Sequence, residues 1–259
     1  MTKVLVTGAG GQLGKTIEKL TQDYANINFF FTSSSDLDIT KASVIEKYFK
    51  EYNPDYCINC AAYTNVEQAE KEPEKAFSVN AEGVRDLSLV CKEYNTLLIH
   101  ISTDYVFDGK KARPYTTEDT PNPINEYGKS KLVGEKYIQQ ILKKYFIIRT
   151  SWLYSKEFGK NFYKTILEKA KTEKEMYITT QQTGCPTDAE NLAVYMISII
   201  ENNTEKYGLH HFCDGEAMTW YDFAKKIILE NKLTEQVKIV EAKNYRTFAR
   251  RPEYSVLRN

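Results

Sequence analysis

Short apolar runs alternate with longer amphipathic stretches through the first 150 residues of the chain. The runs are hydrophobic on both faces and rich in β-branched and aromatic side chains, which is typical of parallel strands covered by helices on both sides. The predicted strands are Val4–Val6, Phe29–Phe31, Tyr56–Cys60, Leu97–Ser102 and Phe146–Thr150. The predicted helices are Gln12–Tyr24, Lys41–Glu51, Pro73–Tyr94 and Asn125–Lys144. This alternation predicts right-handed βαβ units and an α/β fold with a doubly wound parallel sheet.

The order of segments changes after Thr150. The predicted segments there are a loop over Ser151–Lys160, a helix near Asn161–Lys171, a strand near Met176–Thr179, a turn at Gly184–Pro186, and helices near Asp188–Glu201 and Trp220–Glu230. We predict a first domain over residues 1–150 and a smaller C-terminal lobe over residues 151–259. The lobe is expected to pack on the carboxyl edge of the sheet, with some of its segments returning to the first domain.

Composition narrows the class of protein. The 259 residues include 35 basic and 35 acidic side chains, and this zero net charge argues against nucleic-acid binding, which usually needs a basic excess. No apolar run approaches the ~18 residues of a membrane span. The segment Met1–Val6 enters a strand-like run and lacks the features of a signal peptide. We therefore expect a cytoplasmic protein with neither a membrane nor a nucleic-acid partner.

The cysteines and histidines form no pattern typical of a metal site or a disulfide framework. The five cysteines are an odd number, and Cys57 and Cys60 match C-x-x-C inside a strand-like run rather than at a helix N-terminus. We interpret them as reduced structural cysteines. His100, His210 and His211 lie in strand-like segments without metal-ligand spacing. We interpret them as core or sheet-surface residues and predict no metal site.

A glycine-rich segment, Thr7–Gly14, follows the first predicted strand and opens the first predicted helix. Gly8 permits a tight turn, Gly11 lets the backbone approach a pyrophosphate, and Gly14 allows close packing of helix on strand. The free N–H groups and the dipole of the helix N-terminus favour phosphates there. A plain structural turn is the alternative, but the strand–turn–helix context favours a dinucleotide-binding first domain.

The end of the second predicted strand indicates which dinucleotide binds. Many dinucleotide folds carry an acidic residue there, which bonds the 2′-hydroxyl of the ribose. Here the strand ends in Phe31–Ser35, which offers hydroxyls to a 2′-phosphate and contains no carboxylate to repel it. We predict NADPH as the cofactor and keep NADH open, since no arginine is present at this position.

Tyr127 and Lys131 are four residues apart at the start of a predicted helix, so both side chains lie on one face. The pKa of a tyrosine is ordinarily ~10, and a neighbouring ammonium lowers it toward the range in which a general acid works well. Tyr127 can therefore protonate a developing alkoxide, with Lys131 tuning its pKa and bonding the nicotinamide ribose. A surface tyrosine and lysine on a helix is the commoner origin of this spacing taken alone.

The segment Ser102–Gly109 favours the catalytic interpretation. It lies where the fourth predicted strand ends, and ligands of doubly wound sheets bind outside the carboxyl ends of the strands. The hydroxyl of Thr103 can hydrogen-bond a substrate carbonyl and stabilise the charge that develops on it. A strand-end turn is the alternative. A glycine loop, a strand-end threonine and Y-x-x-x-K in this order are hard to explain as coincidence.

At these residues the sequence resembles the extended short-chain dehydrogenase/reductases of the NAD(P)-binding Rossmann superfamily, and within them the dTDP-4-dehydrorhamnose reductase family. The resemblance covers essentially the whole chain. The motifs that carry it are Gly8–Gly14, Asn59–Thr64, Ser102–Gly109, Tyr127–Glu135, Arg149–Tyr154 and Arg251-Pro252. It implies an NAD(P)H-dependent oxidoreductase that reduces the C4 keto group of dTDP-6-deoxy-L-lyxo-4-hexulose and gives dTDP-L-rhamnose.

The resemblance also implies roles for individual residues. Tyr127 would be the proton donor, Lys131 its partner, and Thr103 the hydroxyl that orients the carbonyl. Asp104 and Trp152 would join Thr103 in contacting the nucleotide-sugar substrate, with a core aromatic as the alternative for Trp152. The residues that would line the cofactor together with Tyr127 and Lys131 are Gly8, Gly11, Gln12, Leu13, Gly14, Asp38, Ile39, Ala61, Ala62 and Tyr63.

Three features distinguish this chain from related ones. Sugar-nucleotide 4,6-dehydratases carry Asp-Glu after the threonine, whereas this chain carries Asp104-Tyr105, and a tyrosine of ordinary pKa is a poor base for a carbon acid. Some family members bridge dimers through a metal held by an acidic residue after the glycine loop. This chain has Lys15-Thr16 there, so we expect no metal bridge and leave a homodimer open. Family chains usually continue for ~25–40 residues past the Arg-Pro-x-x-Ser segment as a helix, whereas this sequence stops at Asn259, which indicates a minimal lobe or a shortened chain.

Two other functions stay open at this point. One is a reductase of another nucleotide-linked 4-keto-deoxysugar. The other is a non-catalytic regulatory subunit that keeps the fold and the nucleotide pocket. The presence of Thr103, Tyr127 and Lys131 together favours catalysis over the second.

Overall fold

The computed structural model describes residues 1–242 and 246–258. Its strands are β1 (Thr2–Thr7), β2 (Ile27–Thr32), β3 (Tyr56–Asn59), β4 (Leu97–Thr103), β5 (Tyr145–Thr150), β6 (Leu153–Tyr154), β7 (Glu175–Thr179), β8 (Thr183–Gly184), β9 (Thr187–Asp188), β10 (Gly208–His211), β11 (Met218–Thr219) and β12 (Lys238–Ala242). Its α-helices are α1 (Gln12–Leu20), α2 (Ala42–Tyr52), α3 (Val66–Ala69), α4 (Pro73–Phe77), α5 (Gly83–Glu93), α6 (Glu126–Ile141), α7 (Phe162–Ala170), α8 (Ala189–Glu201) and α9 (Trp220–Glu230). Two 3₁₀ turns, η1 (Thr21–Asp23) and η3 (Asp104–Val106), and one π-helical turn, η2 (Ser78–Glu82), complete the elements.

Six strands form one sheet in the order β10-β5-β4-β3-β1-β2, and every neighbouring pair is parallel. The chain moves from β1 outward to β2 and then crosses back to β3, so the strand order reverses beside β1. Ligands of open α/β sheets bind at such a reversal, outside the carboxyl ends of the strands. The predicted α/β fold with a doubly wound parallel sheet is therefore confirmed.

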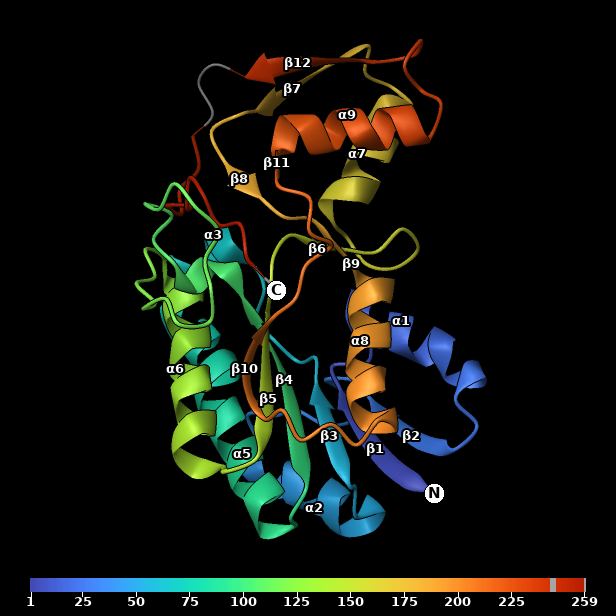
Figure 1. Ribbon diagram of the computed structural model, residues 1–259, viewed down its shortest axis with the longest axis vertical. Helices are drawn as coiled ribbons and strands as arrows, with labels where there is room; N and C mark the ends of the chain where they lie inside the picture. The colour runs from blue at the N-terminus through green and yellow to red at the C-terminus, as the bar shows by residue number, and fades with distance from the viewer. Residues whose placement is uncertain (243–245, 259) are drawn as a thin grey trace.

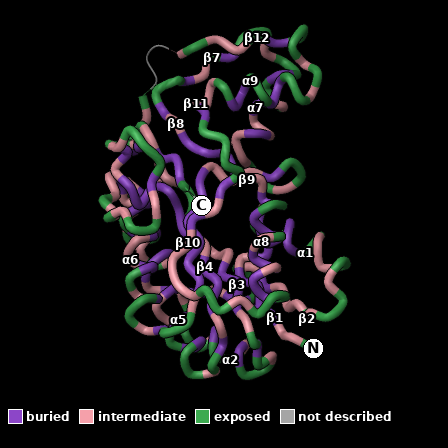
Figure 2. Tube along the Cα trace, viewed as in Figure 1, coloured by how far each residue is buried: buried purple, intermediate pink, exposed green. Residues whose placement is uncertain are grey.

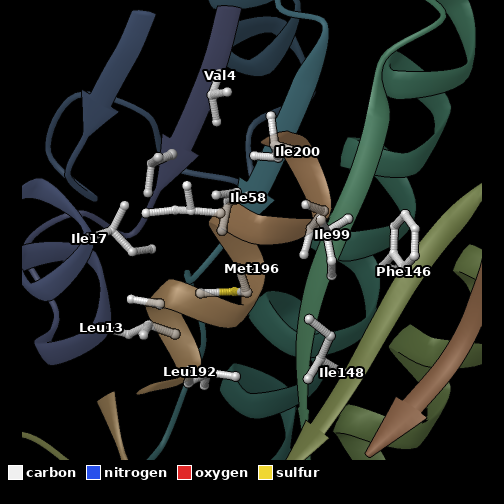
Figure 3. Packing of buried hydrophobic residues seen from close by; sticks show 14 of the residues in the cluster. Val4, Leu13, Ile17, Ile58, Ile99, Phe146, Ile148, Leu192, Met196 and Ile200 are labelled. Atoms are coloured by element: carbon white, nitrogen blue, oxygen red, sulfur yellow. The ribbon is translucent and has the colours of Figure 1, made fainter. Parts of the chain in front are cut away.

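Helices cover both faces of the sheet, with α1 and α8 on one side and α2, α5 and α6 on the other (Figure 1). Successive side chains of a strand point to opposite faces. Val4 and Val6 accordingly pack toward α1 and α8, whereas Leu5 packs toward the other helices, and all three are fully buried. Figure 3 shows the first of these cores, where Met196 of α8 lies over the sheet. The inner strands of the large sheet are mostly buried, and the edge strands β2 and β10 are mostly of intermediate burial (Figure 2).

The C-terminal part of the chain builds a second layer above the carboxyl ends of the strands (Figure 1). Here β7 and β12 pair in parallel, and α7 and α9 pack on them around a separate apolar cluster that includes Ile166, Met176 and Ile227. Two segments that lie between β7 and α9 in the sequence return to the first domain: α8 packs against α1, and β10 pairs with β5 at the edge of the large sheet.

Two predicted helices differ from the observed ones. The helix predicted over Pro73–Tyr94 is divided into α4, the π-helical turn η2 and α5. The side chain of Asn80, within η2, bonds to the backbone of Tyr63 and to the hydroxyl of Ser130. Such single π-helical turns are frequent at functional sites. The helix predicted over Gln12–Tyr24 ends at Leu20, and the 3₁₀ turn η1 follows it directly within the predicted span.

Within residues 1–242 and 246–258, none of the helices combines the length and apolar character needed to span a bilayer. The same described residues contain no cluster of three or more His, Cys, Asp or Glu side chains arranged to hold a metal ion.

Candidate functional site

One cavity of about 900 Å³ opens between the carboxyl edge of the large sheet and the C-terminal layer. Its walls come from the loops after β1, β2, β3, β4 and β5 and from the first turns of α6, α7 and α9. All the residues singled out from the sequence lie on these walls. They are Gly8, Gly11, Gln12, Leu13, Gly14, Asp38, Ile39, Ala61, Ala62, Tyr63, Thr103, Asp104, Tyr127, Lys131 and Trp152.

The glycine-rich loop is shaped by close backbone contacts. Gly8 has φ +67°, and a Cβ there would lie 2.5 Å from the backbone nitrogen of Ala61. A Cβ on Gly14 would lie 2.5 Å from Cα of Ala9. Only glycine fits these two positions, so the loop after β1 can lie tightly against the loop after β3.

The start of α1 fits a dinucleotide phosphate. Gly11 is the N-cap residue of α1, and within the described residues no side chain accepts a capping hydrogen bond from the first turn of this helix. The N–H groups of the first helical turn have no intrahelical acceptors, and together with the helix dipole they favour an anion. The side chain of Gln12 turns away from this end of the helix: its Nε2 donates to the carbonyl of Leu153, and its Oε1 accepts from Asn161. The glycine loop is thereby tied to the C-terminal layer.

The turn after β2 contains a carboxylate that the sequence interpretation overlooked. Oδ2 of Asp36 accepts hydrogen bonds from the backbone N–H of Ser33 at 2.9 Å and from its hydroxyl at 2.5 Å. These bonds lower the pKa of Asp36. The cavity wall at this turn is formed by Ser34, whereas Asp36 is exposed and lies outside the wall. Among Ser33–Asp36, Ser34 is thus the residue that lines the cavity.

Helix α6 packs tightly against the turns η3 and η2 because two of its residues are glycines. A Cβ on Gly128 would lie 2.1 Å from the carbonyl oxygen of Tyr105, and one on Gly134 would lie 2.1 Å from that of Asn80. The side chain of Asn125 caps the helix by accepting from the N–H of Gly128 at 2.7 Å. This close approach brings Tyr127 and Lys131 onto the cavity wall.

Burial decides the acidity of Tyr127. It raises the pKa of the phenol to about 12, and a hydrogen bond with Thr103 acts in the opposite direction. The sequence interpretation expected Lys131 to lower this pKa. That expectation is wrong for the chain without its ligands, because removal from water dominates and the amine of Lys131 bonds elsewhere.

Lys131 is buried, with 2% of its side chain exposed. Its Nζ donates to the carbonyl of Ile101 at 2.6 Å and lies 3.2 Å from Nε2 of His100. Burial lowers the pKa of the amine to about 8, while the negative charge of Glu135 acts in the opposite direction. Lys131 is therefore a lysine that can change its protonation state near neutral pH.

Thr103 and Asp104 form a small network at the end of β4. The hydroxyl of Thr103 donates to Oδ1 of Asp104 at 3.1 Å and accepts from the N–H of Tyr105 at 3.1 Å. The other carboxylate oxygen of Asp104 accepts from the hydroxyl of Ser255 at 2.5 Å. Burial raises the pKa of Asp104 to about 7 despite these bonds. The direction of the Thr103 hydroxyl thus depends on whether Asp104 carries a proton.

Trp152 follows β5 with φ +47° and faces the cavity. Its ring stacks on that of Trp220, with centroids 3.5 Å apart and an interplanar angle of 7°. A Cβ on Gly184 would lie 2.4 Å from the Trp152 ring, so only glycine leaves room for it. The two stacked indoles give the cavity a flat apolar wall.

Arg251 reaches the cavity from the C-terminal segment. Its Nη2 donates to Glu67 at 2.8 Å, and the same carboxylate accepts from the N–H groups of Phe248 and Ala249. Glu67, just inside α3, therefore ties this C-terminal segment to the cavity rim. The bonds from Arg251 and from the two N–H groups hold the pKa of Glu67 below its usual range although burial opposes them.

Several wall residues were missed by sequence reasoning. They are contributed by the C-terminal layer, where no motif pointed to them, and they include Gly159, Asn161, Phe162 and Trp220. Asn161 and Thr219 cap helices α7 and α9, so each places the aromatic residue that follows it at the first turn of a helix. A cap followed by an aromatic residue is a local signal, but only the fold shows that both helices begin at the same cavity.

The chain is similar to named proteins in both sequence and structure. The sequence model of the RmlD substrate binding domain matches residues 1–259. A curated dTDP-4-dehydrorhamnose reductase from Aggregatibacter actinomycetemcomitans is 40% identical over 267 residues, covering 99% of this chain and 90% of that protein. A crystal structure of a dTDP-4-dehydrorhamnose reductase from Clostridium acetobutylicum has 38% identity and a TM-score of 0.94, covering 100% of this chain and 90% of that one.

A second solved structure includes the cofactor. It is a dTDP-4-dehydrorhamnose reductase from Bacillus anthracis in complex with NADP, with 37% identity and a TM-score of 0.94, covering 100% of this chain and 91% of that one. The family model spans the whole chain, and relatives well above 30% identity cover nearly all of it. The chain therefore belongs to the dTDP-4-dehydrorhamnose reductase family.

Proposed function

We propose that this chain is a dTDP-4-dehydrorhamnose reductase that uses NADPH to reduce the C4 keto group of dTDP-6-deoxy-L-lyxo-4-hexulose, giving dTDP-L-rhamnose. The observation that carries the proposal is that Thr103, Tyr127 and Lys131 line the same cavity as the glycine loop. A hydride donor held by the loop and a proton donor on α6 can therefore reach one carbonyl group from two sides.

The residues of the first domain, 1–150, would hold the dinucleotide. The first turn of α1 would bind the pyrophosphate, and Ser34 would face the 2′-phosphate. Bound NADPH supplies the hydride. Lys131 keeps its amine on the cavity wall, where one of its hydrogens can bond an acceptor other than Ile101.

Tyr127 would transfer its phenolic proton to the substrate oxygen as negative charge develops there. Burial keeps this proton on Tyr127 before the reaction, and an ammonium on Lys131 would help it leave. Thr103 can orient the carbonyl only when its hydroxyl hydrogen is released from Asp104. Protonation of Asp104 would release that hydrogen, so we assign to Asp104 a role in aiming the Thr103 hydroxyl as well as a place beside the sugar.

The C-terminal lobe, 151–259, would bind the sugar nucleotide. The stacked pair Trp152 and Trp220 offers an apolar face, and Arg251 offers a positive charge at the rim. A dehydratase is disfavoured because Tyr105 stands where an acid–base carboxylate is needed, and burial raises the pKa of its phenol. The proposal includes a cytoplasmic location, consistent with five free cysteine thiols, and keeps a homodimer as a hypothesis for sedimentation analysis.

The test is NADPH oxidation followed by absorbance with the keto-sugar nucleotide as substrate. Tyr127→Phe should lower kcat by about 10²–10⁴-fold while NADPH still binds, because only the proton donor is lost. Tyr137→Phe is a matched control: it lies on the same helix, and its hydroxyl bonds Glu82 outside the cavity. The control should retain the parent rate.

Three results would overturn the proposal. Equal turnover by Tyr127→Phe would reject the assigned proton donor. Faster reduction of a different nucleotide-linked 4-keto-deoxysugar would reassign the substrate. NADPH binding without turnover of any keto sugar would identify a non-catalytic binding subunit instead.

A further inference from the structure

His100 is a buried residue that the reaction scheme above does not use. It lies on β4 with no exposed surface, between β3 and helix α6. Its Nδ1 lies 3.0 Å from Nδ2 of Asn59, and its Nε2 lies 3.2 Å from Nζ of Lys131. The imidazole therefore joins the amine of Lys131 to a polar side chain in the middle of the sheet.

The direction of these hydrogen bonds follows from Asn59. Its Oδ1 receives the backbone N–H of Ala61 at 3.1 Å, and an N–H can only donate. The hydroxyl of Thr7 bonds the same oxygen at 2.6 Å. The amide is thus fixed with its oxygen toward Ala61 and its NH₂ toward His100. Nδ1 of His100 must accept, so it carries no hydrogen.

A neutral imidazole that accepts at Nδ1 carries its hydrogen on Nε2. That hydrogen points at Nζ of Lys131, which can accept it only as a neutral amine. A neutral amine satisfies every group: it accepts from His100, donates to the carbonyl of Ile101 and keeps one hydrogen for the cavity. An ammonium would place a third hydrogen against the Nε2 hydrogen of the ring.

We infer that His100 is a positioning residue that holds the amine of Lys131 neutral in the free protein at mildly alkaline pH, so that Lys131 takes up a proton when the cofactor binds. The inference rests on the proposed use of NADPH. The negative phosphates of the cofactor and its hydroxyl acceptors favour an ammonium, and they offset the opposition of the ring. Proton uptake then converts Lys131 into the charge that assists Tyr127.

The other charged groups around this pair agree with the inference. Burial holds the pKa of His100 well below its usual range, with Lys131 acting in the same direction. The carboxylate of Glu135 on α6 favours the ammonium, but it is paired with Arg149 of β5. Two further acidic groups, the thiol of Cys60 and the carboxyl of Asp104, belong to residues that line the cavity with Lys131. Cys60 at the end of β3 has a pKa raised by burial, and Asp104 in η3 has one raised to about 7.

The first experiment reads the ring hydrogen directly in the free protein. The chain contains three histidines, so ¹⁵N NMR of ring-labelled histidine gives a spectrum that two variants, His210→Gln and His211→Gln, can assign. We expect His100 to be neutral with its hydrogen on Nε2 at pH ~8.5, where an amine whose pKa is about 8 is mostly neutral. A hydrogen on Nδ1, or a charged ring, overturns the inference whether or not the protein reduces any sugar.

The second experiment measures proton uptake when NADPH binds, by calorimetry at pH ~8.5 in buffers of different ionisation enthalpy. An amine whose pKa is about 8 is mostly neutral there, so we expect uptake of roughly three quarters of a proton at most. Lys131→Met should abolish the uptake, whereas Lys129→Met, an exposed position on the same helix, should retain it.

His100→Gln completes the design, because an amide at this position can turn its oxygen toward the amine and accept from an ammonium. Proton uptake should then fall at least twofold although NADPH binds. Undiminished uptake in His100→Gln, or uptake that persists in Lys131→Met, overturns the inference. Failure of the parent protein to bind NADPH would reject the proposed function. The NMR experiment would still test the position of the ring hydrogen on His100.

Discussion

The hydroxyl of Ser255 donates a hydrogen bond of 2.5 Å to Oδ2 of Asp104, although 151 residues separate the two. Both side chains are about 2% exposed. The bond closes the C-terminal segment onto the end of β4 and leaves the other oxygen of Asp104 to receive Thr103. Asp104 therefore couples the end of the chain to the hydroxyl beside Tyr127.

Asp104 should make stability depend on pH. Its pKa rises from 3.8 in the unfolded chain to about 7 in the fold, so the folded state keeps a proton that the unfolded state has lost. Its contribution is fully present below about pH 4, decreases as the pH rises and is gone above about pH 7. Asp104→Asn should remove this pH dependence of the free energy of unfolding, measured with urea. The difference in that free energy between the variant and the parent should change by up to ~4 kcal/mol between about pH 4 and pH 7. A constant difference between the two proteins would show that Asp104 is ionised throughout.

Ser34 should decide between the two dinucleotides. Ser34→Asp places a carboxylate on the wall where the 2′-phosphate of NADPH would lie, and like charges repel. The KM for NADPH should rise about tenfold relative to the KM for NADH, equivalent to ~1.4 kcal/mol. Ser35→Asp adds the same charge at a position outside the wall and should have a smaller effect. An unchanged ratio of the two KM values would place the 2′-phosphate elsewhere.

Glu135 and Arg149 should be strongly coupled. They form a buried bidentate ion pair with bonds of 2.6 and 2.9 Å, and Ser102 donates to the same carboxylate. Glu135→Gln leaves the charge of Arg149 uncompensated and should lower the free energy of unfolding by ~3–5 kcal/mol. The double variant Glu135→Leu/Arg149→Met should recover part of this loss, because neither charge remains buried. If the double variant lost as much free energy of unfolding as the two single variants together, measured by chemical unfolding, the coupling would be contradicted.

Local patterns in the sequence predicted most of the strands and helices of the first domain. The alternation of strands and helices and the spacing of Gly8, Gly11 and Gly14 are short-range features, and the structure confirms the parallel sheet that they predict. The helix broken at η2 was not predicted, because the side chain of Asn80 bonds partners from Tyr63 and Ser130 that lie 17 and 50 residues away. Patterns among neighbouring residues cannot reveal contacts over such separations.

The sequence by itself determined which chemical groups the protein has and at which strand ends or in which helix they lie, because apolar periodicity predicts the elements and parallel strands end at one edge. The tertiary structure alone decided their protonation and direction. Burial raises the pKa of Tyr127 and lowers that of Lys131, and these effects depend on removal from water rather than on spacing along a helix. The hydrogen positions of His100 likewise follow from Asn59, a neighbour 41 residues away that only the folded sheet brings into contact.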